Sequence, residues 1–175
     1  ASGRIELIRD MVDNFAWLID CVGFIPNGNR SYYCSRSQPP LFALMVNLLA
    51  EAVGDPALPV AYLDQLEREY RFWMSGSEDG THPGTAVRRA VTVEGGILNR
   101  YWDESDRPRQ ESHAEDLQLA REFGTAPSRL FRNIRAACES GWDFSSRWLA
   151  NGQSLATIRT TEVLPVDLNA ILFHL

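Results

Sequence analysis

An aspartate between two aromatic residues is the sharpest candidate for chemistry in this sequence. Asp143 lies between Trp142 and Phe144. An apolar setting disfavours the charged carboxylate and raises its pKa, and a general acid that cleaves a glycosidic bond needs that shift to keep its proton near neutral pH. An aspartate before Phe-Ser-Ser could equally cap a helix, so the residues alone leave both roles open.

Three polar segments mix aromatic rings with amide, guanidinium and hydroxyl groups. They cover residues 26–38, 99–112 and 140–148. A sugar needs this mixture, because its C–H faces pack on aromatic rings while its hydroxyls require directional donors and acceptors. Ordinary loops with satisfied polar side chains would have a similar composition. The mixture therefore favours a carbohydrate site without establishing one.

Two further aspartates have plainer interpretations. Asp103 follows Trp102, and a salt bridge with a nearby arginine is its expected role. Asp167 stands at the start of a predicted helix, where it would cap the helix or interact with its dipole. An arginine close to Asp143 would lower its pKa, so we expect aromatic or backbone groups around that carboxyl rather than a tight pair with Arg147.

Several other classes of site have no signature here. The histidines are scattered, at His82, His113 and His174. No His/Asp/Glu cluster has metal spacing, no nucleophile motif occurs, and Gly95-Gly96 is interpreted as a turn rather than a phosphate loop. We therefore expect neither a metal nor a cofactor. Cys21, Cys34 and Cys138 are an odd number and far apart, so buried or half-buried free thiols are expected.

Charge and hydropathy limit the classes of partner that this chain is expected to bind. The 175 residues carry a net charge of −6, which argues against binding to a nucleic acid or an anionic membrane and is compatible with a neutral ligand. No apolar run is long enough for a transmembrane helix, and residues 1–4 show no signal peptide.

The elements that must position these residues are mainly helical. Apolar residues recur at spacings of three and four in several segments. This spacing predicts helices from about residue 5 to 22, after Pro39-Pro40 to about 53, from Val60 to Met74, near 111–123, near 128–139 and from Val166 onward. Residues 75–85 are expected to form a loop, and 141–165 are mixed. Valine-rich residues 86–101 around Glu94-Gly95-Gly96 predict a short β-hairpin.

The last predicted helix indicates a larger protein. Residues 168–175 are apolar and end without a glycine cap or a polar tail. Such a surface needs a partner, so the chain is interpreted as a segment of something longer.

Several sequence blocks together resemble one enzyme family. The blocks are Ile25-Pro26-Asn27-Gly28-Asn29-Arg30, Tyr32-Tyr33 with Ser35-Arg36-Ser37-Gln38-Pro39-Pro40, Asn99-Arg100-Tyr101-Trp102-Asp103, Ser140-Gly141-Trp142-Asp143-Phe144-Ser145-Ser146-Arg147-Trp148 and Pro165-Val166-Asp167-Leu168-Asn169. In this order and spacing they resemble the trehalases of glycoside hydrolase family 37, most closely the bacterial members, including periplasmic ones.

The resemblance implies a fold, a reaction and a site. It implies that residues 1–175 are part of a single catalytic domain, an (α/α)6 toroid with a short hairpin, which hydrolyses α,α-trehalose to two glucose molecules with inversion. Asp143 would be the general acid. Sugar contacts would fall on Asn27, Arg36, Ser37, Gln38, Arg109, Gln110, Glu111 and Gly141. A periplasmic location is implied, with a cytoplasmic one left open.

The chain departs from the family pattern in two ways. Gln110 stands where the family has proline. The family's N-terminal block and its C-terminal part with the general base do not occur, although an inverting glycosidase needs two carboxylates. The base is therefore expected outside this chain, on remaining segments of the same enzyme. The alternatives are an inactive sugar-binding or scaffold fragment of the same fold, and a toroid glycosidase for another disaccharide.

Overall fold

Six α-helices are the main elements of the part of the chain that the structure describes. The computed structural model describes residues 3–80, 82–124 and 126–175, so the first two residues of the N-terminal segment and Thr81 of the predicted 75–85 loop lie outside it. The helices are α1 (Ile5–Val22), α2 (Phe42–Val53), α3 (Leu63–Trp73), α4 (His113–Phe123), α5 (Pro127–Glu139) and α6 (Val166–His174). All six predicted helices are confirmed.

Glycine and proline set several helix boundaries. Gly23 ends α1 in the left-handed region at φ 94°, where its N–H donates to the Ile19 carbonyl across 2.7 Å. Pro127 opens α5 at a position where a missing N–H costs nothing. The predicted helix from Val60 begins instead as a 3₁₀ turn over Leu58–Tyr62 and becomes α-helical at Leu63.

The observed sheet has one strand more than the predicted hairpin. Strands β1 (Ala86–Val87), β2 (Ala90–Val93) and β3 (Gly96–Asn99) form an antiparallel sheet in the order β1-β2-β3. Gly95, at φ 89°, makes the expected tight turn between β2 and β3. The second turn passes through Arg88 at φ 50°. A non-glycine residue seldom adopts this conformation, so no local pattern indicated the turn.

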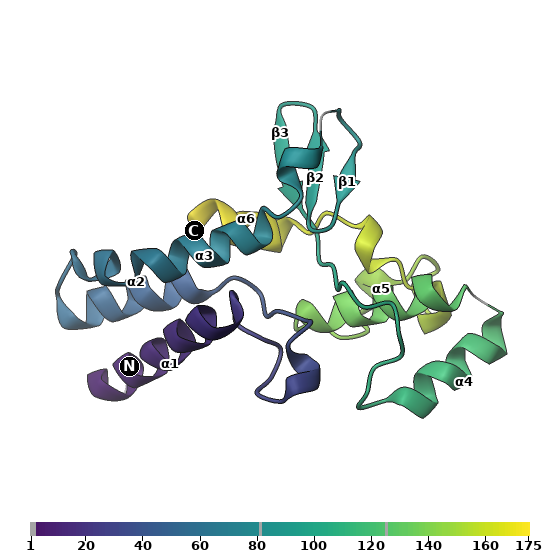
Figure 1. Ribbon diagram of the computed structural model, residues 1–175, viewed down its shortest axis with the longest axis horizontal. Helices are drawn as coiled ribbons and strands as arrows, with labels where there is room; N and C mark the ends of the chain where they lie inside the picture. The colour runs from purple at the N-terminus through teal and green to yellow at the C-terminus, as the bar shows by residue number, and fades with distance from the viewer. Residues whose placement is uncertain (1–2, 81, 125) are drawn as a thin grey trace.

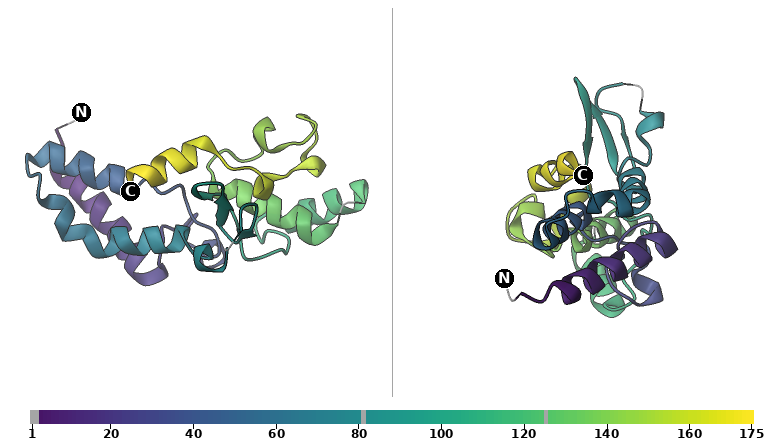
Figure 2. Two further views of the ribbon diagram at one scale, coloured as in Figure 1. Left: turned by 90° about the horizontal axis from the view of Figure 1, so that it is seen from above. Right: turned by 90° about the vertical axis from the view of Figure 1, so that its left-hand side faces the viewer.

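Two hydrophobic cores lie side by side along an elongated molecule. One core joins α1 and α2 through residues such as Val12, Ile19, Phe42 and Leu49. The other surrounds α5 and contains Trp73, Tyr101, Ile134, Trp148 and Leu168. Helix α3 contributes to both cores, and the sheet projects between the two helical groups (Figures 1 and 2). The loops that connect the two groups therefore meet near the middle of the molecule.

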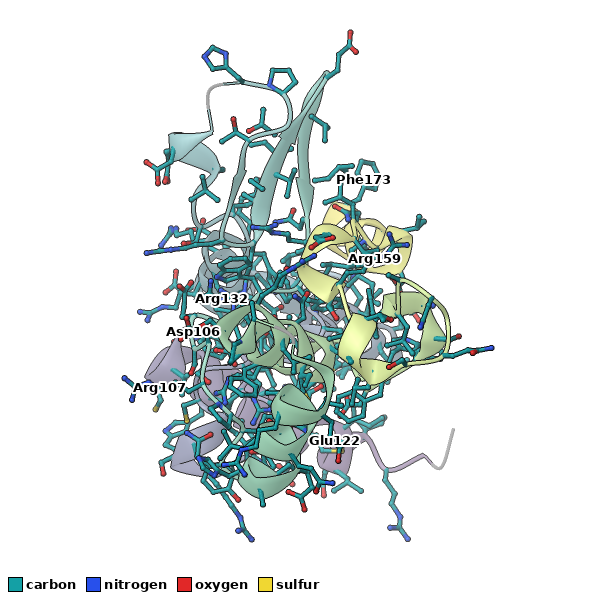
Figure 3. All side chains as sticks on the ribbon, turned by 90° about the vertical axis from the view of Figure 1, so that its right-hand side faces the viewer. Asp106, Arg107, Glu122, Arg132, Arg159 and Phe173 are labelled. Atoms are coloured by element: carbon teal, nitrogen blue, oxygen red, sulfur yellow. The ribbon has the colours of Figure 1, made fainter. Side chains whose placement is uncertain are left out.

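Some apolar side chains have no cover from the described residues. Trp17 on α1 is 64% exposed, and Val166 and Phe173 on α6 are 84% and 95% exposed. Phe173 projects from the surface of α6 (Figure 3). These exposures far exceed those of ordinary core side chains, so the helices present more apolar surface than a closed core would. None of the helices within the described ranges is both long and apolar enough to cross a membrane.

The three cysteines differ in their exposure to solvent. Cys138 is buried, as predicted. Cys21 and Cys34 are exposed free thiols, contrary to the expected burial, because they lie on solvent-facing positions of α1 and of the following loop. The general tendency of free cysteine to be buried is therefore overridden here by the direction in which each segment faces.

Candidate functional site

The loop over residues 26–38 folds back on itself and then onto α5. Its two ends pair as a β-bridge, in which the Asn27 N–H donates to the Arg36 carbonyl across 2.7 Å and the Gln38 N–H donates to the Ile25 carbonyl across 2.9 Å. The Asn27 side-chain amide donates to the Cys138 carbonyl at 2.9 Å. The two ends of the loop are thus held together beside the last turn of α5.

Arg36 is the central cation of this loop. Its side chain is fully buried, and Nη2 donates to Oε1 of Glu111 across 2.8 Å. The guanidinium also lies over the Tyr33 ring, 5.3 Å from its centroid. Among the described residues, Nη1 of Arg36 has no hydrogen-bond partner, and Nε lies 3.9 Å from Oδ2 of the buried Asp103. Leaving a buried guanidinium donor unpaired is costly, so an acceptor oxygen beside Nη1 would be favourable.

The segment 109–111 contacts both this loop and the same end of α5. Arg109 is held by a bidentate pair with Asp116, at 2.7 Å and 3.1 Å, and its Nη1 lies 3.8 Å from Sγ of Cys138. Gln110 accepts a long hydrogen bond from Nη1 of Arg135, at 3.4 Å. The side chain at the position where the family has proline is thus part of the polar network.

Asp143 follows α5 on a short and strained connection. Gly141 and Phe144 both adopt the left-handed region, at φ 69° and 57°. A non-glycine residue such as Phe144 adopts it at a cost of about 1–2 kcal/mol, and such strain tends to persist where the surrounding structure requires it. The helix-cap interpretation of Asp143 is wrong, because Ser145 is the N-cap of the 3₁₀ helix Ser146–Trp148 and its side chain accepts from the Arg147 N–H.

The surroundings of Asp143 favour its neutral form. Burial raises its pKa, while the charge of Arg109 and a hydrogen bond from the Cys138 thiol partly oppose that rise. Asp143 as a whole is nevertheless an exposed residue, so the effect of burial is limited to the part of the carboxyl that faces the protein. Arg147 pairs with Asp167 at 2.8 Å, which agrees with the expectation that it does not form a tight pair with Asp143. The expectation of aromatic or backbone neighbours did not include the Cys138 side chain and the charge of Arg109, both of which act on the pKa of this carboxyl.

Asp167 and Asp103 have the structural roles expected of them. Asp167 lies in the first turn of α6, where a negative charge is favourable. Asp103 is fully buried, and its Oδ2 accepts from Nε of Arg135 across 2.8 Å and from Ser35 Oγ across 3.3 Å. The predicted salt bridge of Asp103 is therefore confirmed.

Glu139 is a buried carboxylate that the sequence did not indicate. It is the last residue of α5, has no exposed surface and accepts hydrogen bonds from Ser37, Arg89 and Trp102. Its position between Cys138 and Ser140 gives no periodic signal. The only clue in the sequence was its place directly before the 140–148 block.

All nine residues singled out in the sequence lie around the C-terminal end of α5. Loop 26–38 contacts α5 through Asn27 and Cys138 and contacts segment 109–111 through Arg36 and Glu111. Arg109 also contacts Cys138, and the connection 140–143 directly follows this end of α5. The arrangement offers uncharged amides, a guanidinium donor without a hydrogen-bond partner and a carboxyl whose pKa is raised by burial, which suits a neutral, hydroxyl-rich ligand. No group of His, Cys, Asp and Glu able to hold a metal ion occurs within the described ranges.

Comparisons with known proteins place the whole chain in one family. Residues 1–175 match the family model described as Trehalase. The chain is 54% identical to a periplasmic trehalase of Xanthomonas oryzae pv. oryzae and 56% identical to one of Pseudomonas aeruginosa, over 99% of its length. It spans about a third of the length of these relatives, at 31% and 32%.

A solved structure supports the same assignment. Neutral trehalase Nth1 from Saccharomyces cerevisiae matches 95% of this chain with a TM-score of 0.61 and 25% sequence identity, and the match covers 32% of the yeast chain. The predicted fold class, mainly helical and part of an (α/α)6 toroid, is confirmed.

Proposed function

The chain belongs to the trehalase family, and from that premise we propose that it is part of an α,α-trehalase that hydrolyses trehalose to two glucose molecules. The observation that carries the proposal is the identity of 54% and 56% to enzymes named periplasmic trehalases over 99% of the chain. The clustering of the sequence-predicted residues at one end of α5 supports this proposal. It means that the likeness to trehalases extends from the structural core to the candidate site.

Asp143 is the proposed general acid. It would donate its proton to the glycosidic oxygen as the bond to the leaving glucose breaks. Two observations support this role. Burial raises the pKa of its carboxyl, and Arg147, the cation closest in sequence, is paired with Asp167 instead. The strained backbone at Phe144 fixes the direction of the connection that carries it.

The general base is proposed to lie outside this chain, and the reaction to invert the anomeric configuration. An inverting enzyme needs a second carboxylate with a water between it and the sugar. The nearby carboxylates in the described part of the chain are each bound to an arginine: Asp103, Glu111, Asp116 and Glu139. A carboxylate whose oxygens are held in an ion pair is poorly placed to take a proton from water, so none of the four is suited to be the base.

Sugar recognition is assigned to side chains on the three loops. Arg36 would bind a hydroxyl with its Nη1 donor, which has no hydrogen-bond partner among the described residues. Arg109 and Glu111 lie beside it, and Asn27, Ser37, Gln38, Gln110 and Gly141 complete the proposed contacts. The site would be selective because buried donors left unpaired by an analogue penalise its binding.

The remainder of the enzyme is the proposed partner of this segment. Trp17, Val166 and Phe173 would be covered by it. The name of the relatives also leads us to propose a periplasmic location for the parent protein.

One substitution tests the catalytic role. Asp143→Asn in the full-length protein should lower kcat for trehalose by several orders of magnitude, because the acid acts on a poor leaving group. Asp106→Asn is the matched control, since Asp106 pairs with Arg132 at 3.8 Å and is not one of the proposed site residues; Figure 3 labels Asp106 and Arg132. Near-normal glucose release by Asp143→Asn would refute the assignment.

A second experiment separates the proposal from its alternatives. The isolated 175-residue chain should bind trehalose weakly or not at all and release no glucose, because it carries the acid without the base. Robust hydrolysis by the isolated chain would mean that the base lies within it. A full-length protein that binds trehalose without cleaving it would favour the inactive sugar-binding interpretation, and cleavage of a different disaccharide on a substrate panel would identify another glycosidase.

A further inference from the structure

One buried carboxylate joins separate parts of the chain. Oε1 of Glu139 accepts from Ser37 twice, from its N–H at 3.0 Å and its hydroxyl at 3.2 Å. Nη2 of Arg89, in the turn between β1 and β2, donates to the same oxygen at 2.8 Å. Oε2 accepts from the Trp102 N–H at 2.9 Å. One side chain of α5 thus holds three parts of the chain: loop 26–38 (the sugar loop), the sheet and the segment after β3.

The site around Glu139 suits the ionised form. Ser37, Arg89 and Trp102 all direct donors at the carboxylate, and Arg89 supplies a full positive charge. Burial raises the pKa of Glu139, while Arg89 and the two backbone N–H groups lower it. Arg89 is itself fixed, since it lies over the Phe72 ring at 4.0 Å and donates to the Trp102 carbonyl. The carboxylate therefore has one orientation available to it.

The contacts of Glu139 reach the proposed sugar-binding residues through Ser37. Arg36 and Gln38 flank Ser37, so the two hydrogen bonds at Ser37 fix the backbone from which both side chains project. The neighbouring Cys138 carbonyl accepts from Asn27 at 2.9 Å and adds a second attachment of the same loop. Asp143 follows shortly after Glu139 in the chain, so the sugar loop and the acid are attached to the same turn of α5.

We propose that Glu139 is a positioning residue, which sets the distance between the sugar-binding loop at Arg36–Gln38 and the acid Asp143 without touching the substrate. The inference rests on the proposed function. A displacement of about 1 Å between binding and catalytic groups is enough to lower a rate by orders of magnitude, so the effect should appear in substrate binding as well as in turnover.

Glu139→Asp in the full-length protein is the main test. It keeps the charge that Arg89 requires but withdraws the carboxylate by one methylene from Ser37 and Trp102. The KM for trehalose should rise about tenfold or more. KM does not depend on the fraction of molecules that are folded, so a purely structural defect would lower only the apparent kcat. Glu162→Asp is the matched control, because Glu162 pairs with Arg129 at the other end of α5, and its KM should stay normal.

The outcomes distinguish the two proposals. Active wild-type enzyme with an unchanged KM in Glu139→Asp would overturn the positioning role alone. Wild-type protein that releases no glucose from trehalose would overturn the proposed function and this inference with it. If Glu139→Asp does not fold, hydrogen exchange of the wild-type protein is the test. The backbone amide of Ser37 should exchange about a hundredfold more slowly than the backbone amide of exposed Asn29. Equal rates would overturn the inference.

Discussion

The guanidinium of Arg147 donates to the carboxylate of Asp167 across 2.8 Å. This pair spans the connection from α5 to α6 and neutralises a cation that lies close to Asp143 in the chain. The arginine that is closest in sequence to the proposed acid is thus paired with another carboxylate, and we expect the pH dependence of the parent enzyme to be sensitive to this pair.

Asp167→Asn should move the alkaline limb of kcat/KM to lower pH. A general acid must be protonated, so activity falls as the pH rises through its pKa. Without Asp167, the positive charge of Arg147 is no longer neutralised and lowers the pKa of Asp143. A shift to lower pH is expected, larger at low salt than at high salt, and Asp106→Asn should leave the profile unchanged. An alkaline limb that stays in place would show that Arg147 does not act on Asp143.

Asp103→Ala should strongly destabilise the protein. The substitution leaves Arg135, which is 1% exposed, without its buried carboxylate. Breaking a buried ion pair from one side costs about 3–5 kcal/mol in the free energy of unfolding, as measured by denaturant titration. Glu162→Ala removes the exposed partner of Arg129 and should cost less than about 1 kcal/mol. Equal losses in the two variants would contradict the buried network.

Glu69 should make stability depend on pH. This carboxyl on α3 is 1% exposed, and burial raises its pKa to about 8. The folded state therefore holds a proton that the unfolded state releases near the ordinary glutamate pKa of 4.5. Stability contributed by this proton is complete below about pH 4.5 and is lost as the pH rises toward 8.

Glu69→Gln should remove that loss, because the amide does not titrate. The free energy of unfolding of the variant, measured against the wild type at several pH values, should rise relative to it across the same range. A constant difference between the two proteins would show that Glu69 does not titrate in this way.

Gly141→Ala should lower both stability and activity. Gly141 has φ 69° and no heavy atom within 4 Å of an added Cβ, so the left-handed backbone is the only obstacle. The expected cost is about 1–2 kcal/mol, with a displacement of Asp143 that lowers kcat. Gly96→Ala is a matched control, because Gly96 also has open space around it but no positive φ. Thermal unfolding and glucose release of both variants would decide the point.

The helices were predictable because a repeating apolar face leaves a local signal. Gly23 and Pro127 marked boundaries for reasons that act within a single turn. The third strand was missed because its turn depends on Arg88 at a positive φ, which the residue type does not indicate. The irregular segment 141–165 contains three 3₁₀ turns, whose place depends on the core around Trp148 rather than on their own sequence.

The site residues were predictable from the sequence, but the buried residues that hold them in place were not. Asn27, Arg36 and Asp143 stood in recognisable blocks, and the structure brings them to one end of α5. Glu139 and Arg89 are ordinary charged residues in the sequence. Their burial follows from contacts between segments as far apart as 102 residues, and local pattern carries no information about such contacts.

The pair of Arg89 and Glu139 has a consequence for how this sequence can change by mutation. Both side chains are buried, at 3% and 0% exposure, so losing either one leaves the opposite charge buried without a partner. A lineage could exchange the pair only for residues that again supply opposite charges and an acceptor for the Ser37 and Trp102 N–H groups, and each single step toward that state is strongly disfavoured. Positions 89 and 139 should therefore covary among related proteins. A change at only one of them should mark a protein that is no longer under selection for its activity.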